Sequence, residues 1–180
     1  MNHGNNDDTI EESQFIQGIK KMVNEQLREK CSLLISKSLE KVAIDGYHAG
    51  SIAPFGYQSV KVDAYCFGRT ITRMKLKIHN GEFSIVNILF CEAIKLINED
   101  NLSYAGLARK LNEMNLLRRG SKWTGQNVKN TLIDPSYCGE KIYGNNRSKI
   151  NAHKQPIKIK CPAIVTKDIF NKVYRYIAKC

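Results

Sequence analysis

One short predicted helix carries four polar side chains opposite its apolar residues Val128 and Leu132. These four are Gln126, Asn127, Lys129 and Asn130. Asn and Gln suit the recognition of base edges, because their amides bond bidentately to adenine in the major groove. The pattern therefore favours hydrogen-bonded recognition of nucleic acid as the chemistry of this segment.

Capping signals fix the ends of this helix and of the one before it. Thr124 is a cap for the second helix, which must end near Asp134 because Pro135 disfavours helical backbone in the preceding residue. Ser103 caps "YAGLARKLNEMN", and its expected inward residues are Ala105, Ala108 and Leu111, with Met114 close by. Two consecutive short helices predict a helix-turn-helix, in which the second helix enters the DNA major groove. The connection "LLRRGSKW" is longer than in the simplest version, so we expect a variant.

Basic residues flank the second helix on both sides. Those in the connection are well placed for backbone phosphates, which position a protein without reading sequence. Beyond the helix, "YCGEKIYGNNRSK" predicts a strand and a turn, as in a wing, and a disordered basic loop is a compatible interpretation. The candidate DNA-binding set is Arg118, Arg119, Lys122, Thr124, Gln126, Asn127, Lys129, Asn130, Arg147 and Lys149.

The charge of the chain is divided unevenly. Residues 1–100 hold 12 Lys and Arg against 13 Asp and Glu, a net −1, whereas residues 101–180 hold 16 against 4, a net +12. An unbalanced basic block of this kind suggests a polyanionic partner, nucleic acid before membrane.

The cysteines and carboxylates show no spacing typical of a catalytic or metal site. The six cysteines include no C-x-x-C pair, so we expect reduced thiols, with neither a disulfide framework nor a zinc ribbon. A nucleophile at Cys138 or Cys161 with His153, and a metal-dependent nuclease, are the enzymatic alternatives. The four carboxylates of the basic half lack metal-ligand or acid-base spacing, and they are Glu113, Asp134, Glu140 and Asp168. No catalytic residue, metal or cofactor is therefore expected.

RNA binding is less favoured, because no aromatic pair falls on a predicted strand.

A long helix is predicted near the amino terminus. Thr9 and Glu12 form a capping box, and apolar residues then recur in steps of three, four or eight up to Val42, before Gly46 ends the run. This predicts a disordered tail over 1–9 and one helix over 10–46, with the remaining domain over 47–180. The apolar stripe is narrow, so we expect a partner for it, either the domain behind it or a second copy. The lysines on its flanks suit a solvated face as well as DNA.

The remaining elements complete a mainly helical α+β fold. Alternation around Val60–Ala64 and Thr72–Ile78 predicts two half-buried strands. A helix over about 83–98 should bury Val86, Phe90, Ala93 and Ile97. The closing segment, capped by Thr166, predicts a packing helix with Ile169, Val173 and Tyr176 or Ile177 on one face. Trp123 and Tyr174 are expected to belong to the core.

No signal peptide or apolar span is visible in the sequence, which predicts a cytoplasmic protein, nucleoid-associated in a bacterium.

Three motifs together resemble a known family. "GYHAGSIAPFGY", "YAGLARKLNEMNLLRRGSKWTGQNVKNTLIDPSYCGEKIYG" and "CPAIVTKDIF" follow one another in the order and spacing of the recombinase domain of large serine recombinases, the phage integrases and conjugative-transposon recombinases. The resemblance covers about residues 10–180, and its strongest element is the tryptophan, the helix, Asp134-Pro135, and then Tyr137 and Gly139.

The resemblance implies a role in DNA integration and excision. In that family a catalytic domain with a serine nucleophile comes first, and a zinc ribbon with a coiled coil follows; residues 10–45 resemble the long helix that joins subunits near the exchange site. The sequence shows neither the serine- and arginine-bearing motifs nor a cysteine pair, so we expect a fragment or truncation that binds an attachment half-site and cuts nothing. By analogy Gln126, Asn127, Lys129 and Asn130 would recognise bases in the outer part of the half-site. The "APFGY" segment over 53–57 would be a structural turn near DNA. Other recombinase subunits are the expected protein partners.

A stand-alone transcriptional regulator remains the main alternative. It would dimerise through residues 10–45 and bind palindromic half-sites separated by whole helical turns, whereas the recombinase domain should bind one half-site as a monomer.

Overall fold

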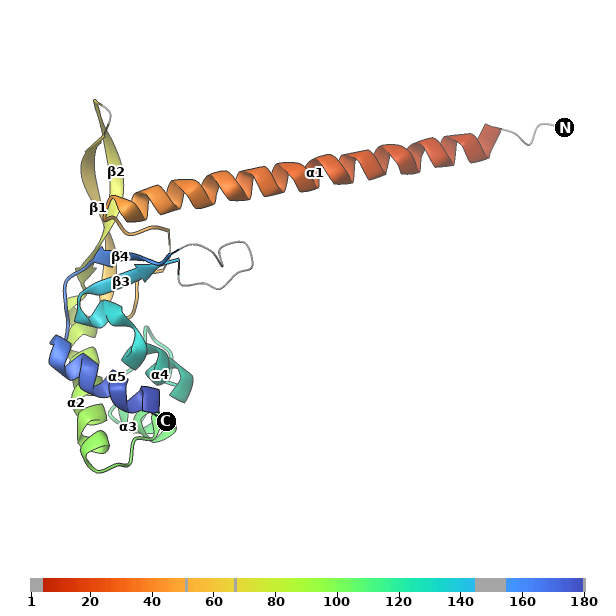
Figure 1. Cartoon of the computed structure of the whole chain (residues 1–180). Helices are drawn as coiled ribbons and strands as arrows, with labels where there is room; N and C mark the ends of the chain where they lie inside the picture. Colours follow the sequence, from red (N-terminus) through yellow and green to blue (C-terminus); the bar gives the residue numbers. More distant parts are fainter. Residues whose placement is uncertain (1–4, 51, 67, 145–154, 180) are drawn as a thin grey trace. The chain divides into compact units, whose positions relative to one another are not determined.

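The computed structural model describes residues 5–50, 52–66, 68–144 and 155–179, with side chains described from residue 14 onward. The chain divides into two compact units, residues 1–41 and residues 42–180. Most of the first unit belongs to the helix α1 (Asn5–Ile44), and the second contains every other element in Figure 1.

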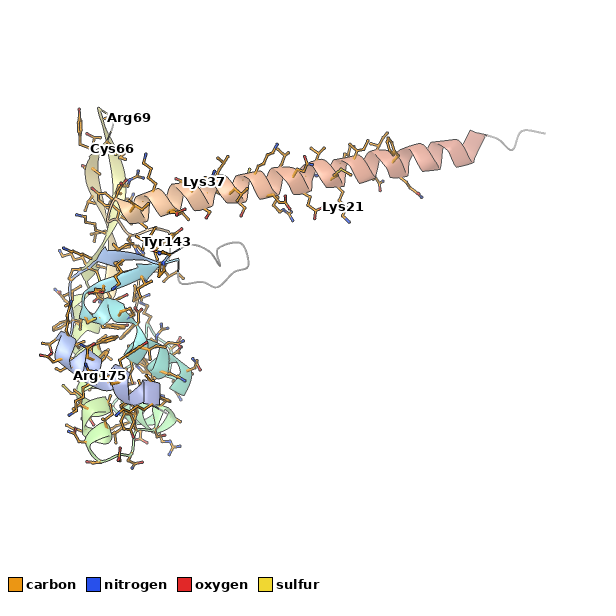
Figure 2. The ribbon with its side chains drawn as sticks, in the orientation of Figure 1. Lys21, Lys37, Cys66, Arg69, Tyr143 and Arg175 are labelled. Carbon is orange, nitrogen blue, oxygen red and sulfur yellow. The ribbon has the colours of Figure 1, made fainter. Side chains whose placement is uncertain are left out.

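Helix α1 begins earlier than the sequence suggests. It starts at Asn5 rather than at about residue 10, so residues 5–9 are helical, and it ends at Ile44; residues 1–4 lie outside the described part. Side chains project from α1 on several sides in Figure 2, where Lys21 and Lys37 are labelled. Apolar side chains remain exposed along it, both on the expected stripe and off it: Phe15, Ile16, Ile19, Met22, Val23, Leu27, Leu33, Leu34 and Ile35. The expected functional division at residue 46 stays a prediction.

The second unit opens with a long antiparallel hairpin. Strands β1 (Tyr57–Cys66) and β2 (Arg69–Ile78) pair along their whole length, from Tyr57 opposite Ile78 to Cys66 opposite Arg69. The alternation of apolar and polar residues predicted both strands. Arg69 and Cys66 lie at the far end of this hairpin (Figure 2).

Helix α2 (Asn80–Asn98) carries the largest buried face of the unit. Its five buried residues are Val86, Leu89, Phe90, Ala93 and Ile97, which include the whole expected stripe. Its cap is His79, whose Nδ1 accepts a hydrogen bond from the Glu82 amide at 3.2 Å. This cap could not be predicted from the sequence, because histidine is not among the preferred capping residues.

Helices α3 (Tyr104–Glu113) and α4 (Gly125–Ile133) form the expected pair. Ser103 and Thr124 cap them, each accepting a backbone N–H three residues ahead. Helix α4 buries Val128 and Leu132 as predicted and ends before Pro135.

The inward face of α3 differs from the prediction at one position. Leu107, Ala108 and Leu111 are buried, while Ala105 is exposed at the start of the helix. In a helix of ten residues, the apolar pattern allows the inward face to include either Ala105 or Leu107. Leu107 faces the core because its larger side chain buries more apolar area. Met114 is also about half exposed, at 49%.

A short helical turn and a second hairpin follow α4. The turn η1 (Pro135–Cys138) leads to β3 (Glu140–Tyr143), which pairs antiparallel with β4 (Ile157–Lys160). Helix α5 (Lys167–Lys179) then packs against α2 and α4 and buries Phe170 and Val173. The expected inward residues Ile169, Tyr176 and Ile177 are only half-buried. The fold is therefore α+β and mainly helical, with the two hairpins at one end of the second unit and α2–α5 at the other (Figure 1).

The "APFGY" turn packs against segments of the second unit that are distant in sequence. Gly56 has φ of +92°, and a Cβ there would come within 3.0 Å of Ile164 and Val86, so glycine is required. The Tyr57 hydroxyl lies within hydrogen-bond distance of the carbonyls of Ser136 and Pro162, to which its single hydrogen can donate, and the Tyr137 hydroxyl donates to the carbonyl of Phe55. The structural role expected for the turn is thus what its contacts show.

Candidate nucleic-acid interface

Helix α4 presents the four predicted polar side chains on its outer side. Gln126, Lys129 and Asn130 are exposed, and Asn127 is half-buried. Gln126 Nε2 donates to Asn130 Oδ1 at 2.8 Å, one turn along the helix. Lys129 Nζ lies 5.7 Å from the centre of the Tyr104 ring, over the start of α3. The helix therefore has one fully buried side and one polar side.

Contacts between α3 and the connection fix where α4 begins. Asn112 exchanges two hydrogen bonds with the Trp123 backbone, at 2.8 and 3.0 Å. The Trp123 indole is buried against Phe55, with ring centres 5.1 Å apart, and donates to the Leu116 carbonyl. This burial agrees with the prediction that Trp123 belongs to the core, whereas the same prediction was wrong for Tyr174, which is 47% exposed and stacks on Phe170. At Gly125, a Cβ would lie 3.3 Å from the Ala105 backbone nitrogen, so α4 approaches α3 closely at its first residue.

The connection between α3 and α4 contains a small turn over residues 118–121, and its two arginines are the first two residues of that turn. Arg118 and Ser121 bond to each other through their backbones, and Arg119 and Gly120 between them have positive φ. The two arginine side chains consequently have different surroundings.

Arg119 is exposed, but its guanidinium belongs to a network of hydrogen bonds within the second unit. Its guanidinium donates to Glu82 from Nε at 2.9 Å, and to the carbonyls of Ala53, Pro54 and Tyr57, each at 3.1 Å. The phosphate contact expected for Arg119 stays a prediction, and such a contact would compete with these four partners. Arg119 ties the start of the connection to the "APFGY" turn.

Glu82 is the anionic partner in this network. Its second oxygen accepts the Gly56 amide at 2.7 Å. Partial burial acts to raise the pKa of the Glu82 carboxyl, but the hydrogen bonds from Arg119 and Gly56 outweigh it and hold that pKa below its usual value. Glu82 therefore stays ionised at neutral pH and keeps Arg119 in place.

Arg118 lies over the face of Phe55, with Cζ 5.9 Å from the ring centre. Its Nε atom is buried and has no hydrogen-bond partner among the described residues. Arg118 is half-buried, and its contact with Phe55 places it beside the aromatic core. Lys122, by contrast, is exposed at the end of the connection.

A shallow groove of about 470 Å³ lies between α3 and the first residues of α4. Arg109, Lys122 and Thr124 are among the residues that line it, together with one carboxylate, Glu113. The sequence did not single out Arg109, although its exposed position on α3, next to the buried Ala108, was a usable signal. The free amides at the start of α4 give this end of the groove a positive partial charge.

The expected wing is present as strands, but its basic tip is not described. Strands β3 and β4 form the hairpin, and Glu140 pairs with Lys158 and Lys167 at its base. Arg147 and Lys149 lie outside the described residues, so their proposed contacts stay predictions.

The two cysteines considered as nucleophiles are held in unreactive surroundings. Burial raises the pKa of the Cys161 thiol to about 11, and it likewise raises that of Cys138. Their Sγ atoms donate to the carbonyls of Ser136 and Pro135. His153 lies outside the described residues. Within the described ranges no three His, Cys, Asp or Glu side chains are grouped as a metal site would require.

No helix in the described part of the chain has both the length and the apolarity needed to cross a membrane.

The fold resembles two solved structures. One is described as a crystal structure of an LSR–DNA complex, where LSR denotes a large serine recombinase; it aligns with a TM-score of 0.52 at 17% identity, over 81% of this chain and 39% of the other. The second comes from work on the sequence requirements of the Listeria innocua prophage attP site and aligns with a TM-score of 0.54 at 17% identity, over 81% and 52%. The chain therefore spans about two fifths to half of the chains that it resembles.

No curated protein matches the sequence significantly. The family model described as Recombinase matches residues 85–179, from within α2 to the end of α5. This match covers more than half of the 180 residues and includes the complete α3–α4 pair, so the chain belongs to the Recombinase family, with the fold of large serine recombinase structures.

Proposed function

We propose that this chain binds double-stranded DNA sequence-specifically at an attachment half-site, as the recognition part of a serine site-specific recombinase. The observation that carries the proposal is α4, whose inner side is fully buried while its outer side presents Gln126, Asn127, Lys129 and Asn130. Membership of the Recombinase family supports DNA as the partner.

The orientation of the amide pair on α4 suits adenine. Gln126 donates one N–H to Asn130 Oδ1, so this bond uses neither the Gln126 carbonyl oxygen, an acceptor, nor the Asn130 amino group, a donor. Adenine presents the complementary donor and acceptor, N6 and N7, in the major groove. Side chains held by their own contacts before binding lose less conformational freedom when they meet the base.

Backbone phosphates suit the groove beside α4. Lys122 and Arg109 line it, and the start of α4 adds backbone amides and the positive end of the helix dipole. Phosphate contacts from these groups would set the register of α4 on the duplex. In this proposal Lys122, Arg118 and Thr124 keep the role expected of them, while Arg119 acts by positioning the connection.

We assign no cleavage step to these residues. Strand exchange requires a nucleophile and groups that stabilise the charge of the transition state. Because the chain spans only part of the chains that it resembles, we propose that this chemistry belongs to another part of a longer recombinase, whose other subunits would be protein partners.

Selection of randomised duplexes by the pure chain tests the proposal. The winning duplex and a scrambled one are then compared by fluorescence anisotropy at several salt concentrations. An asymmetric site bound one to one, with a preference over scrambled DNA that persists at high salt, is the expected result. Binding without any enriched sequence would show that α4 does not recognise bases.

A second candidate function is a dimeric transcriptional regulator. It is favoured by the exposed apolar side chains along α1, which suit a helix-to-helix contact between two copies. Enrichment of a palindrome, bound by two molecules in sedimentation, would support the regulator instead.

A further inference from the structure

A second basic site lies among the strands, apart from α4. A hollow of about 420 Å³ is lined by β2, by β3 and β4, and by the segment that follows α1. Lys75, Lys141 and Lys160 line it, one from each strand, and we call these three residues the lysine cradle. Two apolar residues, Leu76 and Ile159, form part of its wall.

The cradle lacks the carboxylates that neutralise other lysines of this chain. Lys95 and Lys110 pair with Glu92, and Lys158 and Lys167 pair with Glu140. No carboxylate in the described ranges lies within ion-pair distance of a cradle lysine. Glu140 is opposite Lys160 in the strand register, but its oxygens already bind the other two lysines. Asp45 is the one acidic residue among those that line the hollow.

Three ammonium groups outnumber the single carboxylate, Asp45, among the residues that line the hollow. Like charges near a protein surface repel one another, and water and salt screen only part of this repulsion. A cleft with an excess of one charge sign and partly apolar walls also focuses its field on the space inside. The arrangement therefore favours an anion in the hollow over an empty one.

The supporting contacts hold the cradle open. Lys75 lies over the Tyr47 ring, 5.3 Å from its centre, which directs its stem along the aromatic face. Lys141 is half-buried on β3, directly opposite the buried Ile159. The neighbouring His48 is buried, and its backbone amide bonds to Met74 of β2. The segment after α1 is bonded to β2 through its backbone, and β3 is paired with β4, so the fold sets the backbone positions of the three lysines.

We infer that the lysine cradle binds a backbone phosphate of duplex DNA, at a site separate from the one that α4 contacts. This inference rests on the proposed function. Lysine is suited to a phosphate as a point charge on a flexible stem and carries little base specificity. The cradle would thus increase affinity and fix orientation, while α4 supplies preference for sequence.

Replacement of the three lysines by glutamine tests the site, because glutamine keeps much of the stem and removes the charge. The variant K75Q/K141Q/K160Q is compared with K95Q/K172Q/K179Q, which loses the same charge from α2 and α5. Both full-length variants are titrated with the selected duplex and with a duplex altered at one base pair. The slope of log K against log salt is negative, and we expect the cradle variant to lower its magnitude by roughly 0.9 for each phosphate lost. Its preference between the two duplexes should stay unchanged, and the control should keep the original slope.

Further measurements separate folding defects and other anions from the proposed contact. A variant with arginine at all three positions should restore the slope, and thermal unfolding of each variant checks the fold. Equal slopes for the cradle and control variants would overturn the inference. Stabilisation of the wild type by inorganic phosphate over chloride at equal ionic strength, with no change of slope on DNA, would assign the cradle to a free anion and likewise overturn it.

The two proposals fail in different ways. If the wild type shows no preferred sequence but the cradle variant still lowers the slope, α4 recognition fails and the cradle stands. If sequence preference is intact and the slope does not change, the cradle alone fails. Absence of any DNA binding by the wild type overturns both.

Discussion

At the scale of single residues, Asn127 and Lys122 separate recognition of bases from contact with phosphates. We expect Asn127→Ala to reduce the preference at one base pair by about 1 to 3 kcal/mol, because one pair of hydrogen bonds to a base edge is lost. Lys122→Ala should weaken binding to all sequences alike and lower the magnitude of the slope of log K against log salt by roughly 0.9. Anisotropy titrations on matched and singly altered duplexes measure both quantities. Identical behaviour of the two variants would contradict the division of roles on this surface.

Replacement of Arg119 should reduce the stability of the protein more than replacement of Lys122. Arg119→Ala removes a guanidinium bonded to Glu82 and to three carbonyls, and we expect a loss of about 2 kcal/mol or more in the free energy of unfolding. Lys122→Ala, an exposed neighbour in the same connection, should change it by less than about 0.5 kcal/mol. Urea denaturation gives both values. An Arg119→Ala protein of normal stability with a flatter salt slope would restore the phosphate contact that the sequence suggested.

Glu82 makes the same network sensitive to acid. Its pKa is lower in the folded protein than the ordinary value of 4.5, so its contribution to stability is present above that pH and is lost as the pH falls through the folded value. We expect Glu82→Gln to be less stable than the wild type at pH 7, with the difference shrinking as the pH falls below 4.5. Urea denaturation between pH 7 and pH 3 measures this. A difference that stays constant over the range would mean that ionisation of Glu82 contributes nothing.

This network was not predictable from local sequence patterns. The two arginines in "LLRRGSKW" look equivalent, and both were expected at phosphates. Arg119 instead bonds to Glu82, 37 residues away, and to carbonyls more than 60 residues away. Only the folded chain brings such partners together, whereas the outward position of Gln126 and Asn130 followed directly from the helical period.

At the scale of elements, the caps of α3 and α4 form a matched pair. Ser103 and Thr124 each accept one backbone N–H, so Ser103→Ala and Thr124→Ala should each reduce the free energy of unfolding by about 1 kcal/mol. Only Thr124 lines the groove beside α4, so only its replacement should also weaken DNA binding. Chemical denaturation and anisotropy on the same samples give the comparison. Equal effects of the two substitutions on affinity would show that Thr124 acts through stability alone.

Elements were predicted best where one residue type determines a local conformation. Both caps, the end of α4 before Pro135 and the alternation of β1 and β2 follow from such rules. The inward face of α3 was assigned partly to Ala105, because a ten-residue helix allows neighbouring phases. The lysine cradle was not predicted, since its members come from three strands of two separate hairpins, which no local sequence pattern brings together.

At the scale of the whole molecule, the uneven charge of the sequence corresponds to two candidate surfaces in one unit. Helix α4 with its groove and the lysine cradle both belong to residues 42–180, which hold their own core. The basic half of the chain contributes to both surfaces, and β2 adds Lys75 from the balanced half. Sequence alone located the excess charge but did not show that it was divided between two places.

The boundary between the two units gives a final prediction. Val42 and Ala43 are buried, at 9% and 1% exposure, and both belong to the second unit. The Gly46 and Tyr47 amides also bond to the carbonyls of Ala43 and Val42. A fragment of residues 42–180 should therefore unfold cooperatively and keep the sequence preference of the full chain. A fragment that starts at residue 47, the boundary suggested by the sequence, loses both side chains and should be less stable by about 1 to 3 kcal/mol. Thermal and urea unfolding of the two fragments decide between the boundaries, and equal stability would place the edge of the folded unit at residue 47.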